Sequence, residues 1–267
     1  MSLVDTNWLE KNSDKVKIID CSWHMPQTQR NGFDEYKNNH IKNAIFFDLD
    51  KNSKKDIDLP HMLTDAKSWE NIVSSMGIKN DDQIVIYDNS DVISSCRCWY
   101  NLIYFGHNPE LVHVLDGGLK KWIEEDRATI SDIIKTIPSN YTVHEKKELV
   151  KDINQINKNV LENKFNVIDA RNLERFEGKV PEPRKGLRSG SIKNSFCLPF
   201  SELINQDHTF ISKEKIHEKF KSTRYEVGKN IVFTCGSGVT ASVLALAYSL
   251  INNKYMPNIY TLSLIPI

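Results

Sequence analysis

A cysteine beside a run of small residues is the strongest candidate for chemistry in this chain of 267 residues. Cys235 follows the apolar run 231–234, and residues 236–241, which begin with Gly-Ser-Gly, separate it from a second apolar run over 242–248. This order predicts a strand, a tight loop and a helix. Backbone N–H groups of such a loop, together with the positive end of the helix dipole, stabilise a thiolate, the nucleophilic form of cysteine. We interpret Cys235 as a nucleophile; the alternative is a buried structural cysteine.

The charge balance argues against two large classes of partner. The chain carries 35 basic and 35 acidic residues, so its formal net charge is zero, and the charges are scattered rather than gathered in blocks. We therefore expect no nucleic-acid binding and no binding to a membrane surface. The partner expected instead is a small molecule. No apolar run approaches the length of a membrane span, and residues 1–9 hold no apolar core of signal length.

The cysteines indicate a reducing compartment. The chain has five of them, an odd number without the spacing of a disulfide framework. Cys96 and Cys98 form a Cys-x-Cys pair that has no partner pair at zinc-site spacing, so we expect no metal site and no cofactor. These observations favour a cytoplasmic protein, with a mitochondrial pool as the second possibility. The remaining cysteines are Cys21, Cys197 and Cys235.

Three short segments occur twice, at offsets of 147 to 151 residues. They are 16–20 with 165–169, 40–45 with 191–196, and 83–88 with 230–235. Similarity at a nearly constant offset indicates a duplicated unit, so we expect two tandem domains. The first domain would span residues 1–130 and the second residues 148–267. Residues 131–147, which have no steady hydrophobic period, would be the linker.

The elements around the cysteine predict an α/β fold. Short β-branched runs alternate with longer amphipathic segments, which favours a mainly parallel sheet with helices on both faces. Reactive groups in such sheets lie at the carboxyl ends of strands, where Cys235 falls. Asp88 occupies the matching place in the first repeat, so the first domain lacks the nucleophile and would supply one wall of a cleft. Predicted strands of the first repeat are 18–20, 44–47, 84–87 and 112–115, and predicted helices are 66–76 and 98–105.

At this point the chain resembles a known family. The segment 235–241 is similar to the active loop of the 3-mercaptopyruvate sulfurtransferases, within the tandem rhodanese-domain family. Further segments resemble family landmarks in the same order, and the resemblance covers nearly the whole chain. They are 20–23, 46–50, 61–63, 115–122, 175–178 and 181–184. The resemblance implies two rhodanese-like domains and a sulfurtransferase activity.

The resemblance also implies a reaction and the residues that bind the substrate. Cys235 would attack the sulfur of 3-mercaptopyruvate, form a persulfide and release pyruvate. The sulfur would then pass to an acceptor thiol such as thioredoxin, or to cyanide in an assay. Arg175 and Arg184 match family arginines that hold the substrate's carboxylate and carbonyl oxygens, a task that suits a planar guanidinium. Taken alone, each of these arginines is typical of a solvated surface charge.

A Ser-His-Asp set assists proton movement in the family, and its members match Ser237, His61 and Asp50 here. The relay would join the two domains, because His61 and Asp50 come from the first repeat. Asp50 would fix the tautomer of His61. Without the resemblance, His61 reads as an ordinary loop residue and Asp50 as a helix cap or turn residue. The remaining predicted substrate-binding residues lie in the loop and are Gly236, Gly238, Val239 and Thr240.

The residues after the cysteine favour one sulfur donor over another. Family members that prefer thiosulfate carry basic residues there, whereas Gly236 and Ser237 are uncharged. A keto-thiol donor is therefore the predicted substrate, with thiosulfate as the alternative. Cysteine phosphatases use a related loop with an additional residue and an arginine at the position of Ala241. The sequence therefore argues against phosphatase activity.

The end of the chain departs from the family pattern. The first repeat follows its last strand with a Gly-Gly-Leu-Lys-Lys-Trp segment at 117–122, but residues 258–267 contain no counterpart. We therefore expect the second domain to lack its last helix. This expectation keeps a further alternative open, an inactive rhodanese-like protein with a binding or regulatory role. Ser191 also replaces a family histidine, which we take as neutral for the chemistry.

Overall fold

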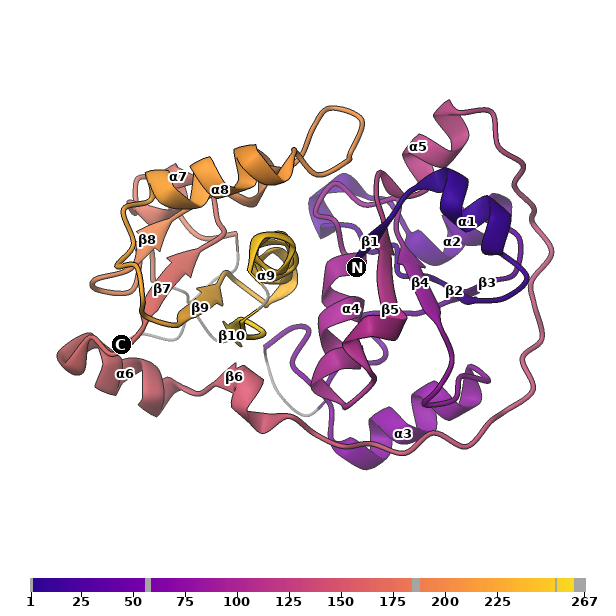
Figure 1. The fold of residues 1–267 in the computed structure, drawn as a ribbon, viewed down its shortest axis with the longest axis horizontal. Coiled ribbons are helices and arrows are strands. Elements are labelled where there is room, and N and C mark those ends of the chain that lie inside the picture. The colour runs from indigo at the N-terminus through magenta and orange to yellow at the C-terminus, as the bar shows by residue number, and fades with distance from the viewer. Residues whose placement is uncertain (1, 56–58, 184–187, 253, 262–267) are drawn as a thin grey trace. The chain divides into compact units, whose positions relative to one another are not determined.

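The computed structural model describes residues 2–55, 59–183, 188–252 and 254–261 (Figure 1). It divides the chain into two compact units. The first unit comprises Met1–Lys146 together with the short segment Gln206–Thr209, and the second comprises Lys147–Asn205 and Phe210–Ile267. Within the described residues, no helix is both long and apolar enough to cross a membrane.

Each unit is built on a sheet of five parallel strands, and the two sheets share one strand order. The first sheet runs β1-β5-β4-β2-β3 and the second runs β6-β10-β9-β7-β8. This order confirms the predicted α/β class and its two mainly parallel sheets. The first sheet contains β1 (Leu3–Val4), β2 (Lys17–Asp20), β3 (Ala44–Phe46), β4 (Ile84–Tyr87) and β5 (Val112–Leu115). The second contains β6 (Val150–Lys151), β7 (Asn166–Asp169), β8 (Phe196–Cys197), β9 (Ile231–Thr234) and β10 (Asn258–Tyr260).

Helices and short 3₁₀ turns connect the strands, as parallel pairing requires. In the first unit they are α1 (Thr6–Asn12), η1 (Pro26–Thr28), α2 (Gly32–Asn38), α3 (Ala66–Ser75), α4 (Ser95–Tyr104), η2 (Pro109–Leu111) and α5 (Gly118–Glu124). In the second they are η3 (Lys147–Leu149), α6 (Ile153–Glu162), α7 (Leu173–Phe176), η4 (Phe200–Leu203), α8 (Lys213–Ser222) and α9 (Val239–Ile251).

Both faces of the first sheet are covered by helices. Adjacent residues of a strand point to opposite faces, so each strand contributes side chains to both layers. Val85 packs in one core with Leu9 of α1 and Trp122 of α5. On the other face α4 contacts β4 and β5. The ring of Trp69, on α3, stacks on Phe105 with centroids 4.6 Å apart. The strands are therefore buried on both sides, which explains their continuous apolar runs.

The second sheet is covered in the same way. Val232 packs with Ile156 of α6, whereas the adjacent Phe233 meets the rings of Phe220 on α8 and Tyr248 on α9. The helix expected to be missing from this unit would follow β10. Residues 262–267 lie outside the described residues, so the structure does not test that expectation.

Helix caps explain where several of these helices begin, and α9 differs from them. The side chains of Asp5, Asp65 and Asp152 accept hydrogen bonds from N–H groups in the first turns of α1, α3 and α6. The cap of α9 is Gly238, which provides no side-chain acceptor. Its backbone φ of +84° lies in the left-handed region that glycine adopts without strain. The N–H groups at the start of α9 are therefore available to another acceptor.

Two aspartates at equivalent places have different surroundings. Asp20 ends β2 and Asp169 ends β7, and each accepts a 2.9 Å bond from the backbone N–H two residues later. In the second unit that later residue is Arg171, whose guanidinium pairs with Asp169. In the first unit it is Ser22, which carries no charge. Burial raises the pKa of Asp20 to about 7, and the buried carboxyl of Asp88 adds to the rise.

We predict that Asp20 makes the first unit less stable as the pH rises from about 4 to 7. The ordinary pKa is 3.8. Across this window the folded unit keeps a proton that the unfolded chain releases, so the free energy of unfolding falls by about 1.4 kcal/mol per pH unit. Above pH 7 the loss is complete. Asp20→Asn should remove this slope.

Denaturant unfolding followed by tryptophan fluorescence measures this effect. All five tryptophans lie within residues 1–146, so the signal reports on the first unit. Asp81→Asn, at an exposed aspartate, is the control that should keep the wild-type slope. Equal slopes for Asp20→Asn and the wild type would contradict the prediction.

Candidate active site

Cys235 lies between the last residue of β9 and the cap of α9, as the sequence predicts. Its side chain is buried, with 2% of the residue exposed. The backbone N–H groups of Gly238 and Ala241 donate to its Sγ atom at 3.1 and 3.4 Å. The sulfur therefore accepts the N–H groups that the uncapped start of α9 leaves available. These bonds and the positive end of the helix dipole both stabilise negative charge on sulfur.

The other cysteines have a different environment. The Sγ atoms of Cys21 and Cys197 donate to backbone carbonyl oxygens at 3.7 and 3.5 Å, so these groups are neutral thiols. Burial raises the pKa of Cys21 and Cys96 well above the ordinary value, and that of Cys197 to about 12. Cys235 is thus distinguished from Cys21 and Cys197 by accepting backbone hydrogen bonds at its sulfur.

The predicted loop residues differ in their contact with the sulfur and in their burial. Of the predicted loop residues, Gly238 donates to the sulfur, and the second recorded donor is Ala241. Ser237 and Val239 are buried, whereas Gly236 and Thr240 are half-buried. Every residue type except proline has a backbone N–H, so the alanine side chain at position 241 gives no indication of this role.

His61 and Asp50 meet within the first unit, as the resemblance implies. The His61 Nε2 atom lies 2.9 Å from Asp50 Oδ1. Since a carboxylate only accepts, the imidazole donates from Nε2. This hydrogen bond is the main cause that lowers the pKa of Asp50. The imidazole is buried, with 1% of its side chain exposed, whereas 66% of the Asp50 side chain is exposed.

Two further residues hold this pair, and the sequence did not single them out. Trp23 donates its Nε1–H to Asp50 Oδ2 at 3.0 Å, and its ring packs edge-on against the imidazole of His61 at 4.6 Å. Arg97, wholly buried on α4, donates from Nη2 to the backbone oxygen of His61 at 2.8 Å. His61 has a φ of +56°, a left-handed conformation that a non-glycine residue adopts when its surroundings fix it.

Of the two predicted substrate arginines, the structure places one. Arg175 lies on α7, and its Nη2 is 2.5 Å from Glu182 Oε2. Arg184 lies outside the described residues. The third member of the predicted relay, Ser237, belongs to the second unit, whereas His61 and Asp50 belong to the first.

The first unit has a carboxyl group where the second has its cysteine sulfur. Asp88 follows β4 as Cys235 follows β9. Its two oxygens accept the backbone N–H groups of Ser90 and Ser95 at 2.8 and 2.9 Å. The loop of the first unit therefore keeps two backbone hydrogen bonds but has a carboxyl group in place of the thiol.

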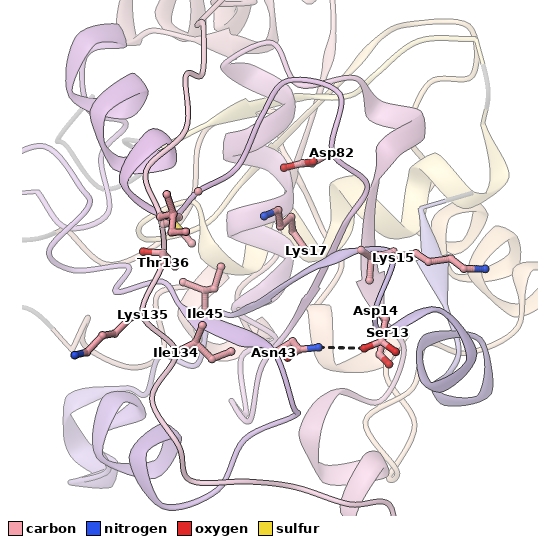
Figure 2. Close-up of a pocket in the computed structure, with 14 residues that line it drawn as sticks. Ser13, Asp14, Lys15, Lys17, Asn43, Ile45, Asp82, Ile134, Lys135 and Thr136 are labelled. Carbon is pink, nitrogen blue, oxygen red and sulfur yellow. Dashed lines mark hydrogen bonds between the residues drawn. The ribbon is translucent and has the colours of Figure 1, made fainter.

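A pocket of about 450 Å³ lies at the opposite edge of the first sheet (Figure 2). Its lining includes Lys17 at the start of β2, and Ile134 and Thr136 from the segment after α5. Because the strands are parallel, their amino ends lie away from Asp20 and Asp88 at the carboxyl edge. This pocket therefore contains none of the residues described above. Across the described ranges, no three His, Cys, Asp or Glu side chains are grouped as a metal site would require.

The chain is similar to known sulfurtransferases along most of its length. Residues 5–125 match the model of the rhodanese-like domain. Thiosulfate/3-mercaptopyruvate sulfurtransferase 1 of Arabidopsis thaliana, a mitochondrial protein, is 35% identical over 96% of this chain and 73% of its own length. The 3-mercaptopyruvate sulfurtransferase of Mus musculus is 32% identical over 96% of this chain and 88% of its own.

A solved structure supports the same relationship. The crystal structure of SseA from Escherichia coli, a 3-mercaptopyruvate sulfotransferase with the rhodanese fold, superimposes with a TM-score of 0.88 at 28% identity. The match covers 97% of this chain and 98% of the other. The strand order, the cysteine loop and these likenesses agree, and the chain belongs to the thiosulfate and 3-mercaptopyruvate sulfurtransferases of the rhodanese family, which are transferases.

Proposed function

We propose that this protein transfers sulfur from 3-mercaptopyruvate to a thiol acceptor through a persulfide on Cys235, and that it releases pyruvate. The observation that carries the proposal is the Cys235 sulfur, which accepts two backbone N–H groups at the start of α9. The name shared by the Arabidopsis, mouse and Escherichia coli relatives supports the choice of donor.

The reaction balances without a cofactor. The Cys235 thiolate attacks the substrate sulfur and forms the S–S bond, while the electrons of the broken C–S bond go to carbon and give the enolate of pyruvate. The proton of the substrate thiol ends on that carbon. An acceptor thiolate then attacks the outer sulfur of the persulfide, takes it and restores the Cys235 thiolate.

In this mechanism the remaining residues bind the keto acid and move the proton. Arg175 and Arg184 would hold the carboxylate and the carbonyl oxygen, and they would stabilise the charge of the enolate. His61, which carries its proton on Nε2 toward Asp50, would exchange the substrate proton at Nδ1 through Ser237. Gly236, Val239 and Thr240 would complete the walls around the transferred sulfur.

The donor and the acceptor are the finer parts of the proposal. The uncharged Gly236 and Ser237 give little attraction to a dianion, so we favour the keto-thiol over thiosulfate. A thioredoxin-like dithiol is the proposed acceptor. We place the reaction in a reducing compartment, either the cytoplasm or the mitochondrial matrix.

Steady-state assays test the proposed function. With 3-mercaptopyruvate and a reduced dithiol, the purified protein should produce pyruvate and sulfide, and kcat/KM should exceed the value with thiosulfate and cyanide. Folded protein that turns over neither donor would instead support a binding or regulatory role. A higher efficiency with thiosulfate would reverse the donor assignment.

Replacing the nucleophile should abolish the persulfide. After incubation with 3-mercaptopyruvate alone, intact-protein mass spectrometry should find one added sulfur atom on the wild type and none on Cys235→Ser. The matched controls are Cys21→Ser and Cys96→Ser, whose buried thiols take no part in the proposed chemistry. An added sulfur on Cys235→Ser would disprove the assignment.

Removing the charge beside the histidine should slow the first half of the reaction. Asp50→Asn removes the carboxylate charge that accepts the Nε2–H of His61. We expect kcat to fall by about 100-fold, within the usual range for general acid–base catalysis. Pre-steady-state release of pyruvate measures this step. Asp48→Asn, which removes a carboxylate paired with Lys51 in the same loop, should stay within about twofold of the wild type. Equal losses in both variants would argue against the role of Asp50.

A further inference from the structure

Four charged side chains form a buried chain of ion pairs in the second unit. Arg171 Nη2 lies 2.6 Å from Asp169 Oδ2, and its Nη1 lies 2.6 Å from Glu182 Oε1. Arg175 Nη2 lies 2.5 Å from Glu182 Oε2. The order is Asp169, Arg171, Glu182, Arg175, with alternating sign. Only 1% of the Glu182 side chain is exposed, compared with 23% for Arg175, the last of the four ion-paired residues.

Glu182 determines which edge of Arg175 is available to a ligand. Besides the bond from Nη2, the Arg175 Nε–H donates to Glu182 Oε1 at 3.3 Å. The carboxylate thus takes the side of the guanidinium formed by Nε and Nη2. Nη1 and the second Nη2 hydrogen form the end of the fork, for which no partner is recorded among the described residues. This end has the geometry that accepts a carboxylate through two parallel bonds.

The sheet places this chain of ion pairs at the edge that carries the cysteine. β7 pairs with β9, so that Asp169 lies opposite Thr234, the residue before Cys235. The N–H of Ala170 donates to the Thr234 oxygen at 2.8 Å, which keeps the two strand ends together. Arg171 and α7 therefore leave the sheet beside the Cys235 loop.

The fold itself does not require these charges. The first unit forms the same turn after Asp20, with Ser22 in the place of Arg171 and with the same 2.9 Å bond to the carboxyl oxygen. No arginine is recorded at Asp20 in the described part of the first unit. The ion pairs occur in the unit that carries the nucleophile, which indicates a role in that unit's chemistry.

We propose that Glu182 is a positioning residue that selects α-keto-acid donors; this inference rests on the proposed function. Its carboxylate holds Arg175 by one edge and directs the other edge at the carboxylate of the donor. The Glu182 carboxylate also cancels one of the two arginine charges. Asp169 cancels the other, so the net charge of the four groups is zero. A doubly charged donor such as thiosulfate therefore gains little attraction from them.

Glu182→Gln separates this role from a purely structural one because it predicts different changes for two donors. For 3-mercaptopyruvate, kcat/KM should fall by about tenfold or more, mainly through KM, since Arg175 loses the charged partner that orients it. For thiosulfate, kcat/KM should stay unchanged or rise, since the site gains a net positive charge. Glu177→Gln, at a glutamate paired with Lys179, is the matched control and should change neither value.

A double-mutant cycle with Arg175→Met tests whether Glu182 acts through Arg175. If it does, kcat/KM for 3-mercaptopyruvate should be no lower in the Glu182→Gln/Arg175→Met double variant than in Arg175→Met alone. If Glu182→Gln does not fold, Glu182→Asp keeps the charge but is too short to reach both arginines. It should lose 3-mercaptopyruvate efficiency without gaining efficiency with thiosulfate.

The outcomes separate this inference from the proposed function. Equal losses for both donors, an unchanged KM, or additive effects in the cycle would overturn the role of Glu182 and leave the proposed function intact. A wild-type protein that releases no pyruvate from 3-mercaptopyruvate would overturn both.

Discussion

The parallel pairing of β7 with β9 is the constraint on which the candidate site depends. It sets Asp169 opposite Thr234, so the next residues of both strands leave the sheet at one edge. One strand continues into the cysteine loop and α9, and the other into Arg171 and α7. Cys235 and the Arg171 guanidinium, which are 64 positions apart in sequence, are thereby attached to neighbouring strand ends.

The two units show what this backbone does with different residues. Both have the same strand order, and both end β2 or β7 with an aspartate that accepts the same backbone bond. In the second unit the aspartate is neutralised by Arg171. In the first unit burial raises the pKa of the aspartate to about 7, and Ser22 supplies no counter-charge. The backbone thus specifies the turn, and the side chains specify whether that turn carries charge.

Local sequence order predicted the α/β fold and the place of Cys235 between β9 and α9. The repeated segments indicated two similar domains, and the strand, small-residue and helix order around Cys235 depends only on neighbouring residues. The pairing of His61 with Asp50 came from the family resemblance, since the two residues are 11 positions apart and the sequence between them has no periodic signal. Arg171 and Glu182 were missed because charged residues in a loop are usually solvated, and only the fold shows that these two are buried together. Ala241 was missed because its contribution is a backbone N–H.

Asp88 has a consequence for how the two loops respond to chemical change. An aspartate carboxyl cannot be oxidised, alkylated or persulfidated under conditions that modify a thiolate. The N–H groups of Ser90 and Ser95 therefore keep the same oxygen acceptors whatever the redox state of the surroundings. In the second unit the equivalent acceptor is the Cys235 sulfur, so in the proposed reaction its hydrogen bonds adapt each time that sulfur gains or loses a substituent. The duplicated scaffold thus combines one chemically inert loop with one that would change in every cycle of the proposed reaction.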